Sequence, residues 1–432
     1  MADLRVDFAG IRSPNPFWLA SGPPTNTYGQ VARAFDAGWG GAVWKTLGEP
    51  IINVYSRYGS VDYAGTRMIG LNNIELITDR PLEDNLREIA DVKRNYPNHA
   101  VIVSLMVESR REAWHEIVTK TEDTGADGIE LNFGCPHGMS ERGMGAAVGQ
   151  VPDYTCQIVE WVKEVAKIPV IVKLTPNVTD VTYIARAAKK GGADAVSLIN
   201  TINSIVSVDL DTFAPNPAVH GKGSHGGYCG PAVKPIALNM VAAVAGDPEV
   251  GIPISGIGGI LTWRDAAEFM ALGATTVQVC TAVMHYGFRI VEDMIDGLEN
   301  WMDEREFRTI LDFAGRAVPN VMKWEDLDLN YHTVARIDYG KCIECELCYT
   351  ACEDGAHQAI RRNGRGNGPP AVEIIDEACV GCNLCFLVCP VEGCITMAQV
   401  PNGAPAVSWK DFTAGRGKLA PRPEHFHTAK FG

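Results

Sequence analysis

Eight short apolar segments, each followed by a helical pattern, constrain the fold more than any other feature of this sequence. The segments are mostly continuous apolar runs, which is typical of parallel strands covered on both faces. Eight strand–helix units in about 300 residues predict an α/β fold, a (β/α)₈ TIM barrel. The predicted strands are residues 17–21, 42–46, 101–106, 128–132, 169–174, 195–200, 253–259 and 276–281.

The segments between these runs carry helix signals. Pro152 and Asp153 suit the first turn of a helix, and Thr262 suits the capping position of another. Glycines stand where helices should end before four of the runs, at Gly38, Gly125, Gly192 and Gly273. A doubly wound sheet is the structural alternative, but it requires a G-x-G-x-x-G turn after the first strand. Residues 21–24 read Ser-Gly-Pro-Pro instead.

Polar side chains end most of the predicted strands. The C-terminal ends of barrel strands carry the chemistry in this fold, and the loops after the seventh and eighth strands commonly hold a phosphate. A polar group at a strand end can simply cap the strand, but lysine, amide and hydroxyl groups gathered there indicate a ligand site. The polar residues concerned are Ser21, Lys45, Thr46, Asn132, Lys173, Asn200, Thr201, Cys280 and Thr281, and the seventh strand ends in the glycine-rich segment 256–259, which includes Gly258 and Gly259.

A glycine-rich loop at residues 132–150 follows the fourth predicted strand. It begins at Asn132 and carries a thiol, Cys135, at its root. We predict that this is a catalytic loop that brings the thiol to a ligand held by Asn132. The alternative for Cys135 considered alone is a small buried cysteine at a strand end. The connections 47–82 and 201–235 are also long enough to be functional or covering loops.

Two runs of four cysteines form the strongest motif of the chain. Eight of its 13 cysteines fall within residues 342–389, in two C-x₂-C-x₂-C-x₃-C runs. This spacing is typical of iron–sulfur ligation, and zinc is the less favoured alternative. The runs resemble a bacterial ferredoxin with two [4Fe–4S] clusters. In that resemblance one cluster takes Cys342, Cys345, Cys348 and Cys389, and the other takes Cys379, Cys382, Cys385 and Cys352.

The charge and hydropathy of the chain exclude some classes of partner. The formal net charge is −14, whereas nucleic acids and anionic membranes require a basic face. No apolar run reaches the roughly 20 residues of a membrane helix. The acidic residues near the N-terminus are unlike a targeting peptide. We therefore expect a cytoplasmic protein in a reducing compartment, which binds neither nucleic acid nor membrane.

Several short motifs, taken together in order, resemble a known family. They are Asn15-Pro16-Phe17-Trp18-Leu19-Ala20-Ser21, Asn73-Ile74-Glu75, Asn132-Phe133-Gly134-Cys135-Pro136-His137, Lys173-Leu174-Thr175-Pro176-Asn177, Asn200-Thr201, Gly230-Pro231-Ala232-Val233-Lys234 and Gln278-Val279-Cys280. They resemble the FMN barrel of the dihydropyrimidine and dihydroorotate dehydrogenase flavoproteins. With the cysteine runs, the pattern is similar to the A subunits of bacterial NAD-dependent dihydropyrimidine dehydrogenases. Gly134 is a departure, because relatives often carry serine there.

The resemblance implies a role for each motif residue. Cys135 would donate a proton while reduced FMN supplies a hydride to the 5,6 double bond of uracil or thymine. Asn73, Asn132, Asn200 and Thr201 would read the donors and acceptors of the pyrimidine edge, and His137 would at most assist. Lysines would face the flavin ring and glycines its phosphate. The cofactor-binding residues would be Ala20, Ser21, Lys45, Thr46, Lys173, Gly230, Gly258, Gly259, Cys280 and Thr281.

The chain is expected to divide into an FMN barrel (1–304), a linker (305–334), a ferredoxin-like domain (335–400) and a tail (401–432). Because no dinucleotide fingerprint is present, the resemblance implies a partner subunit that carries FAD and the NAD(H) site, around a homodimeric core of a heterotetramer. Two other functions stay open at this point. One is a dihydroorotate dehydrogenase, and the other is an iron–sulfur electron carrier whose barrel is only a scaffold.

Overall fold

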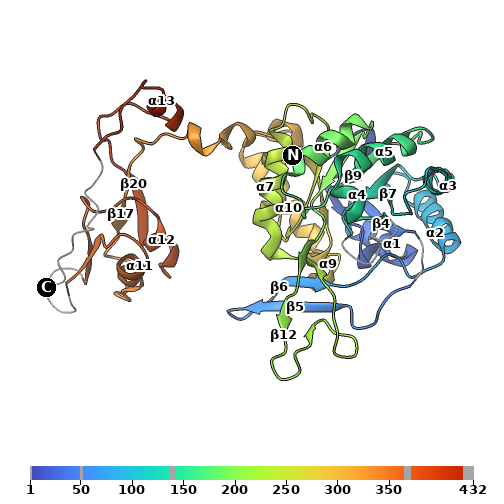
Figure 1. Cartoon of the computed structure of the whole chain (residues 1–432), viewed down its shortest axis with the longest axis horizontal. Coiled ribbons are helices and arrows are strands. Elements are labelled where there is room, and N and C mark those ends of the chain that lie inside the picture. Colours follow the sequence, from blue (N-terminus) through green and yellow to red (C-terminus); the bar gives the residue numbers. More distant parts are fainter. Residues whose placement is uncertain (1, 49–51, 136–142, 364–370, 422–432) are drawn as a thin grey trace. The chain divides into compact units, whose positions relative to one another are not determined.

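The computed structural model describes residues 2–48, 52–135, 143–363, 371–421 of the chain. The chain divides into two compact units, Met1–Val321 and Met322–Gly432 (Figure 1). The unit boundary falls inside the segment 305–334 that the sequence suggested as a linker. Among the described residues, no helix is both long enough and apolar enough to cross a membrane.

Unit 1 is a closed barrel of eight parallel strands. Neighbours around the barrel follow the order β10-β15-β16-β3-β4-β7-β8-β9. All eight predicted runs form these strands, with ends that agree within two residues, so the predicted (β/α)₈ fold is confirmed. The strands are β3 Phe17–Leu19, β4 Gly41–Leu47, β7 Ala100–Leu105, β8 Gly128–Asn132, β9 Val170–Lys173, β10 Ala195–Leu198, β15 Ile254–Ile257 and β16 Ala274–Val279.

Helices follow each barrel strand and cover the outside of the barrel. Gly38 ends the first of them in a left-handed conformation (φ 115°), and Thr262 caps another together with Asp265, as the sequence predicts. The covering helices are α1 Tyr28–Ala37, α2 Leu82–Asn95, α3 Arg111–Glu122, α5 Pro152–Lys163, α6 Val181–Lys190, α7 Lys234–Ala245, α8 Trp263–Ala271 and α10 Ile290–Glu304; the shorter α4 Ala146–Gly149 and α9 Thr281–Tyr286 lie in the connections.

A hairpin closes the N-terminal end of the barrel. Strands β1 Val6–Phe8 and β2 Ile11–Ser13 pair antiparallel. Phe8 and Ile11 are buried against residues at the beginnings of the barrel strands, including Trp18. Because this end is filled by apolar side chains, space for a ligand remains at the opposite, C-terminal end of the strands.

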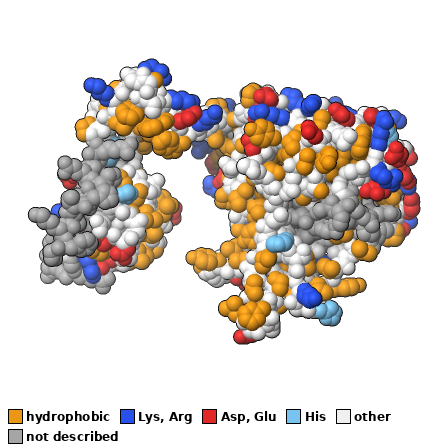
Figure 2. All heavy atoms as spheres, in the orientation of Figure 1, with side chains coloured by type: hydrophobic (Ala, Val, Ile, Leu, Met, Phe, Trp, Pro, Cys, Tyr) orange, Lys and Arg blue, Asp and Glu red, His pale blue; other side chains and the backbone are white. Residues whose placement is uncertain are grey.

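The two long connections pair with each other in a four-stranded antiparallel sheet, which we call the cover sheet. Its order is β11-β14-β6-β5, with β6 Thr66–Asn73 beside β14 Gly226–Cys229 and with β5 Tyr58–Tyr63 and β11 Ile202–Ser204 at the edges. A further hairpin, β12 Ser207–Val208 with β13 Pro215–Asn216, extends from it (Figure 1). Apolar side chains gather on these elements (Figure 2), including the exposed Tyr63, Leu210 and Phe213.

Unit 2 contains the cysteine runs. Strand β17 Thr333–Ile337 pairs with β20 Ile395–Gln399, and β18 Ile360–Arg362 pairs with β19 Val372–Ile374. Each cysteine run leads into a helix, α11 Leu347–Gly355 or α12 Leu384–Val388. The described part of the tail, which includes α13 Trp409–Thr413, is held by Asn330, whose Nδ2 donates to the carbonyl oxygen of Pro405 at 2.7 Å.

Candidate active site and cluster-binding domain

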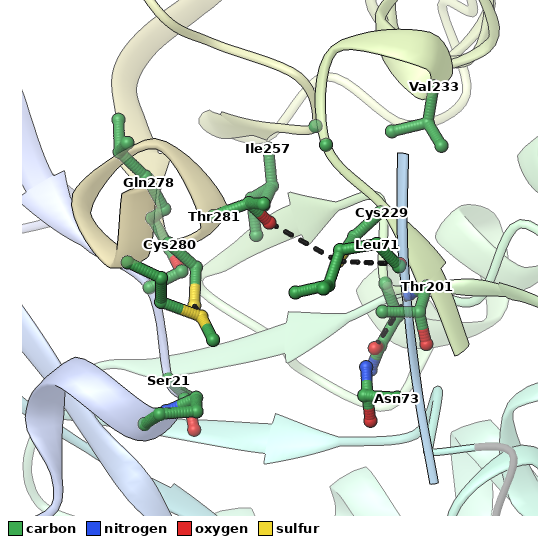
Figure 3. Close-up of a pocket in the computed structure, with 18 of the residues that line it drawn as sticks. Ser21, Leu71, Asn73, Thr201, Cys229, Val233, Ile257, Gln278, Cys280 and Thr281 are labelled. Atoms are coloured by element: carbon green, nitrogen blue, oxygen red, sulfur yellow. Dashed lines mark hydrogen bonds between the residues drawn. The ribbon is translucent and has the colours of Figure 1, made fainter. Parts of the chain in front are cut away.

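One pocket at the C-terminal ends of the barrel strands is lined by Cys135 and by every substrate- and cofactor-binding residue predicted from the sequence. It encloses about 1120 Å³ of empty space, part of it open to solvent. The cover sheet forms one wall through Asn73, Tyr228 and Cys229, and the strand end at Gln278 lies among the other lining residues (Figure 3). The folding of two distant connections thus completes a site that the barrel alone would leave open.

Strand register places the polar residues of the pocket side by side. Asn132 ends β8 opposite Lys173 at the end of β9. Asn200 donates through Nδ2 to Oδ1 of Asn132 at 2.8 Å, and Asn132 donates through its own Nδ2 to the Thr46 hydroxyl at 3.0 Å. Asn73 is fixed by donating to the carbonyl oxygen of Gly227 at 3.1 Å. The three carboxamides are therefore oriented before any ligand binds. Asn73 and Asn200 retain donor and acceptor capacity, whereas Asn132 retains one N–H donor, because its Oδ1 already accepts from Asn200 and from the backbone N–H of Gly134.

Lys45 is buried and forms an ion pair on the pocket wall. Its Nζ lies 2.5 Å from Oε1 of Glu75, and the same oxygen accepts from Arg57 at 3.0 Å. The Tyr58 hydroxyl donates to Glu75 Oε2 at 2.9 Å. Burial, and then the neighbouring Glu75 carboxylate, raises the pKa of Tyr58 above its ordinary value. The Glu75 carboxylate, which Lys45 shares with Arg57, holds the Lys45 ammonium at the pocket by a charge-assisted contact.

Lys173 is paired with a glutamate inside the barrel. Its Nζ lies 3.6 Å from Oε1 of Glu130, which is fully buried. The other carboxylate oxygen of Glu130 accepts from Ser197 at 2.8 Å and from Nε2 of Gln278 at 3.0 Å. The buried Oε1 of Gln278 has no partner within the described protein. Buried amide oxygens normally accept a hydrogen bond, so this unpartnered oxygen indicates that a donor is missing at the pocket.

Glycines shape a backbone cradle on another side of the pocket. Gly258 and Gly259 have left-handed backbones, with φ of 129° and 72°. A Cβ at residue 259 would lie 2.9 Å from the Gly230 carbonyl oxygen and 2.8 Å from Lys234 Cβ. The conformation and the lack of space both require glycine here. Backbone without side chains, next to the start of α9 at Thr281, suits the close approach of a phosphate.

Cys135 lies between the pocket and a small apolar cluster. It is 9% exposed and packs with Ile77, Met106 and Met144, while its backbone oxygen accepts from Ala146 at 3.1 Å. The thiol therefore reaches the pocket from a position that is nearly closed to solvent. The predicted assisting residue His137 lies outside the described residues, together with most of the tip of the predicted catalytic loop.

Two further thiols line the pocket. The Thr281 hydroxyl donates to the sulfur of Cys229 at 3.2 Å (Figure 3). Burial raises the pKa of Cys229 to about 11, which the Thr281 contact partly offsets. Burial, with a smaller contribution from Cys229, raises the pKa of Cys280 to about 12. Both groups are neutral thiols at ordinary pH, and they act as small apolar surfaces.

The cysteines of unit 2 surround two separate cavities. Cys342, Cys345, Cys348 and Cys389 line one with about 340 Å³ of empty space, and the fourth cysteine thus comes from the other run. The second cavity, with about 350 Å³, is lined by Cys352, Cys379, Cys382 and Cys385. These are the two sets that the resemblance implies. Four thiols around a cavity suit a four-iron cluster, whereas no group of His, Cys, Asp or Glu in the described residues could hold a metal ion directly.

Comparison with known proteins places both units in families. The model of the family described as dihydroorotate dehydrogenase matches residues 3–302, and the model described as a 4Fe-4S dicluster domain matches residues 335–397. The chain belongs to the dihydroorotate dehydrogenase family. A dicluster domain follows its barrel, so the predictions of a flavin-binding barrel and of two 4Fe-4S clusters are confirmed at family level.

The similar proteins within this family include enzymes of two kinds. The chain is 44% identical to the NAD-dependent dihydropyrimidine dehydrogenase subunit PreA of Escherichia coli K12, over 92% of this chain and 96% of that protein. It is 43% identical to the chloroplastic dihydropyrimidine dehydrogenase (NADP(+)) of Arabidopsis thaliana, over 75% and 79% of the two chains. It is 38% identical to the catalytic subunit of dihydroorotate dehydrogenase B (NAD(+)) of Pyrococcus horikoshii, over 73% and 98%.

A solved structure shows the family's barrel. The dihydroorotate dehydrogenase of Eimeria tenella in complex with ferulenol superposes with a TM-score of 0.58 at 17% identity, covering 72% of this chain and 88% of that one. At this identity the likeness establishes the fold alone. The family model and the sequence relatives identify the chain as an oxidoreductase, in agreement with the predicted enzyme class.

Three residues in or beside the pocket, Glu75, Glu130 and Tyr58, received no role from the sequence. Glu75 follows Asn73 by two residues, and the alternation of an extended chain should have placed both on one face. Glu130 is a lone charge inside a continuous apolar run, which signals a buried partner such as Lys173. Tyr58 left no signal, because its position depends on how the cover sheet pairs.

Proposed function

We propose that this chain is the catalytic subunit of a dihydropyrimidine dehydrogenase, which reduces the 5,6 double bond of uracil or thymine reversibly. The observation that supports this most is the meeting of three carboxamides, Asn73, Asn132 and Asn200, with Thr201 and the Cys135 thiol in one pocket. A pyrimidine edge alternates N–H donors with C=O acceptors, and carboxamides offer both kinds of partner.

The remaining lining residues fit FMN. Gly230, Gly258, Gly259 and Thr281 would hold its phosphate, and the unpartnered Gln278 Oε1 would accept from a ring N–H. Lys45 and Lys173 would stabilise negative charge on the reduced ring. Ala20, Ser21, Thr46 and Cys280 would complete the walls around it. When bound, FMN supplies the hydride for one carbon of the pyrimidine double bond.

Cys135 would supply the proton for the other carbon from its Sγ. A thiol with an ordinary pKa of about 8.5 is mostly protonated at neutral pH and can give up its proton to a developing carbanion. Apolar neighbours such as Met106 and Met144 keep bulk water from this sulfur. The carboxamides orient the pyrimidine so that the receiving carbon faces the thiol.

The second candidate is dihydroorotate oxidation, which the pocket charges disfavour. Orotate carries a carboxylate that needs a cation of its own. The cations lining the pocket are Lys45 and Lys173, and each is already paired with a buried glutamate, Glu75 or Glu130. Glu75 also lines the pocket and would repel the carboxylate. These charges favour the uncharged uracil ring.

We further propose that electrons pass through two [4Fe–4S] clusters, held by the two cysteine sets, from a partner subunit that carries FAD and the NAD(H) site. We also propose a homodimeric core and a cytoplasmic, reducing location, which suits eight thiols that must bind iron. The name of the similar subunit from Escherichia coli supports a multi-subunit enzyme.

The test is to reduce the anaerobically purified chain with dithionite and to add uracil, thymine or orotate. We expect stoichiometric dihydrouracil or dihydrothymine by mass spectrometry, and no dihydroorotate. Efficient formation of dihydroorotate would replace the proposal with the second candidate. Absence of any reduced pyrimidine would support the electron-carrier function instead.

A further inference from the structure

A ninth cysteine in unit 2 lies against one of the two thiol-lined cavities. Cys394 follows Cys389 by five residues and belongs to neither run. It is 3% exposed and lines the cavity formed by Cys342, Cys345, Cys348 and Cys389. It belongs to the buried cluster against which Cys342 and Cys389 pack, and in this structure its thiol donates to the carbonyl oxygen of Asp338 at 3.7 Å. This cavity thus has five thiols, one more than a four-iron cluster needs as ligands.

The corresponding position beside the other cavity is different. The residue five positions after Cys352 is His357, which lines the second cavity but is exposed. The sulfur of Cys352 accepts instead from the backbone N–H of Ala359 at 3.2 Å. The two cysteine runs repeat each other, but the polar groups next to their sulfurs do not. The two clusters therefore experience different surroundings.

We propose that Cys394 tunes the cluster held by Cys342, Cys345, Cys348 and Cys389. When the cluster is bound, its S–H turns from the Asp338 carbonyl oxygen to the stronger acceptor, a ligand thiolate of Cys342 or Cys389 on the same cavity. The proposal depends on the cluster ligation proposed above. A hydrogen bond to a ligand thiolate draws charge from the sulfur and stabilises the reduced cluster more than the oxidised one. The reduction potential of this cluster is therefore higher than it would be without Cys394.

The simplest competing explanation is that Cys394 only fills space, as buried cysteines often do. A second is that Cys394 is itself an iron ligand in place of Cys389. Alanine removes the donor with little change in volume, and serine keeps a donor. Glu346 also lines this cavity and is paired with Arg362 at 2.8 Å, but it is unchanged in both variants.

The experiment is a potentiometric titration followed by electron paramagnetic resonance. It uses the full chain carrying Cys394→Ala or Cys394→Ser, with iron content measured in parallel. We expect the iron of two four-iron clusters in both variants. Cys394→Ala should shift one of the two midpoint potentials to more negative values, whereas Cys394→Ser should stay at or above the wild-type value. The controls Cys156→Ala, in the barrel, and His357→Ala, at the other cavity, should leave the affected cluster unchanged.

Three outcomes would overturn the proposal. Unchanged potentials in Cys394→Ala would show that the residue only fills space. Equal negative shifts of the midpoint potential in Cys394→Ala and Cys394→Ser would exclude a hydrogen bond donated by Cys394. Loss of one cluster in Cys394→Ala, with both retained in Cys389→Ala, would make Cys394 a ligand. None of these readouts uses a pyrimidine, so they are independent of the proposed substrate.

Discussion

Asn200 donates through Nδ2 to Oδ1 of Asn132 at 2.8 Å, which joins two strand ends of the barrel at the floor of the pocket. Gly134 makes this approach possible. A Cβ at residue 134 would lie 2.4 Å from Asn200 Cβ and 2.5 Å from its Nδ2. Glycine at residue 134 is therefore matched to the position that Asn200 takes in this chain.

We predict that Gly134→Ala displaces Asn200 and weakens pyrimidine binding. The loss of one well-placed hydrogen bond, about 1.4 kcal/mol, corresponds to a roughly tenfold increase in KM for uracil. Flavin content should not change. The matched control is Gly29→Ala, on the surface of α1, where the nearest atom to a new Cβ is Arg33 Nη1 at 3.9 Å. Equal KM values for the two variants would contradict this role of Gly134.

Cys135→Ala should abolish most turnover without loss of either ligand. A positioned general acid contributes about 10²- to 10⁴-fold, so kcat for uracil should fall by at least 100-fold. Spectral titration should still show bound FMN and uracil. Cys156→Ala is the control, because that thiol is buried on α5 near Glu160 and away from the pocket. Turnover above a tenth of wild type would remove Cys135 from the mechanism.

Glu75→Gln should change substrate preference. The substitution removes a carboxylate that pairs with both Lys45 and Arg57. The positive charge of Lys45, which lines the pocket, is then no longer balanced by Glu75, so orotate should inhibit the variant more strongly than wild type, while uracil binding weakens. Inhibition constants for orotate measure this change. Glu88→Gln, which loses a pair with Arg80 outside the pocket, is the control. An unchanged orotate constant in Glu75→Gln would contradict the electrostatic argument against orotate.

The thiols of Cys229 and Cys280 should resist alkylation until the pH is high. The reactive form is the thiolate, and burial raises the pKa of Cys229 to about 11 and of Cys280 to about 12. Both stay protonated below these values, so iodoacetamide at pH 8 should leave them unmodified in the folded protein. Modification should increase only as the pH approaches 11. Peptide mass spectrometry checks this, and rapid labelling of Cys280 at pH 8 would show that the thiol is not buried as described.

The barrel could be predicted because each of its strands is marked by a pattern of neighbouring residues in the sequence. A run such as 128–132 is continuous and apolar, and a glycine such as Gly125 marks the helix end before it. The ends of these strands predict Lys45, Asn132 and Lys173 as pocket residues, and all three line the pocket. Local patterns were sufficient there because the fold itself brings all strand ends together.

The cover sheet could not be predicted in the same way. Asn73 pairs with Gly227, more than 150 residues later in the chain, and neither segment carries a distinctive strand pattern. The place of Tyr58 on the pocket wall depends on that pairing. The ion pair of Lys173 with Glu130 was also missed, because the partner of a buried charge depends on strand register and not on sequence distance.

The central claim is that a flavin, the three carboxamides and the Cys135 thiol act together on a pyrimidine, with NAD(H) chemistry elsewhere. The most direct measurement is the reverse half-reaction of the isolated, oxidised chain under anaerobic conditions. Dihydrouracil should bleach the flavin absorbance, and this bleaching should be absent in Cys135→Ala, whereas NADH should leave the wild-type spectrum unchanged. Rapid bleaching by NADH, or none by dihydrouracil and dihydrothymine, would contradict the account.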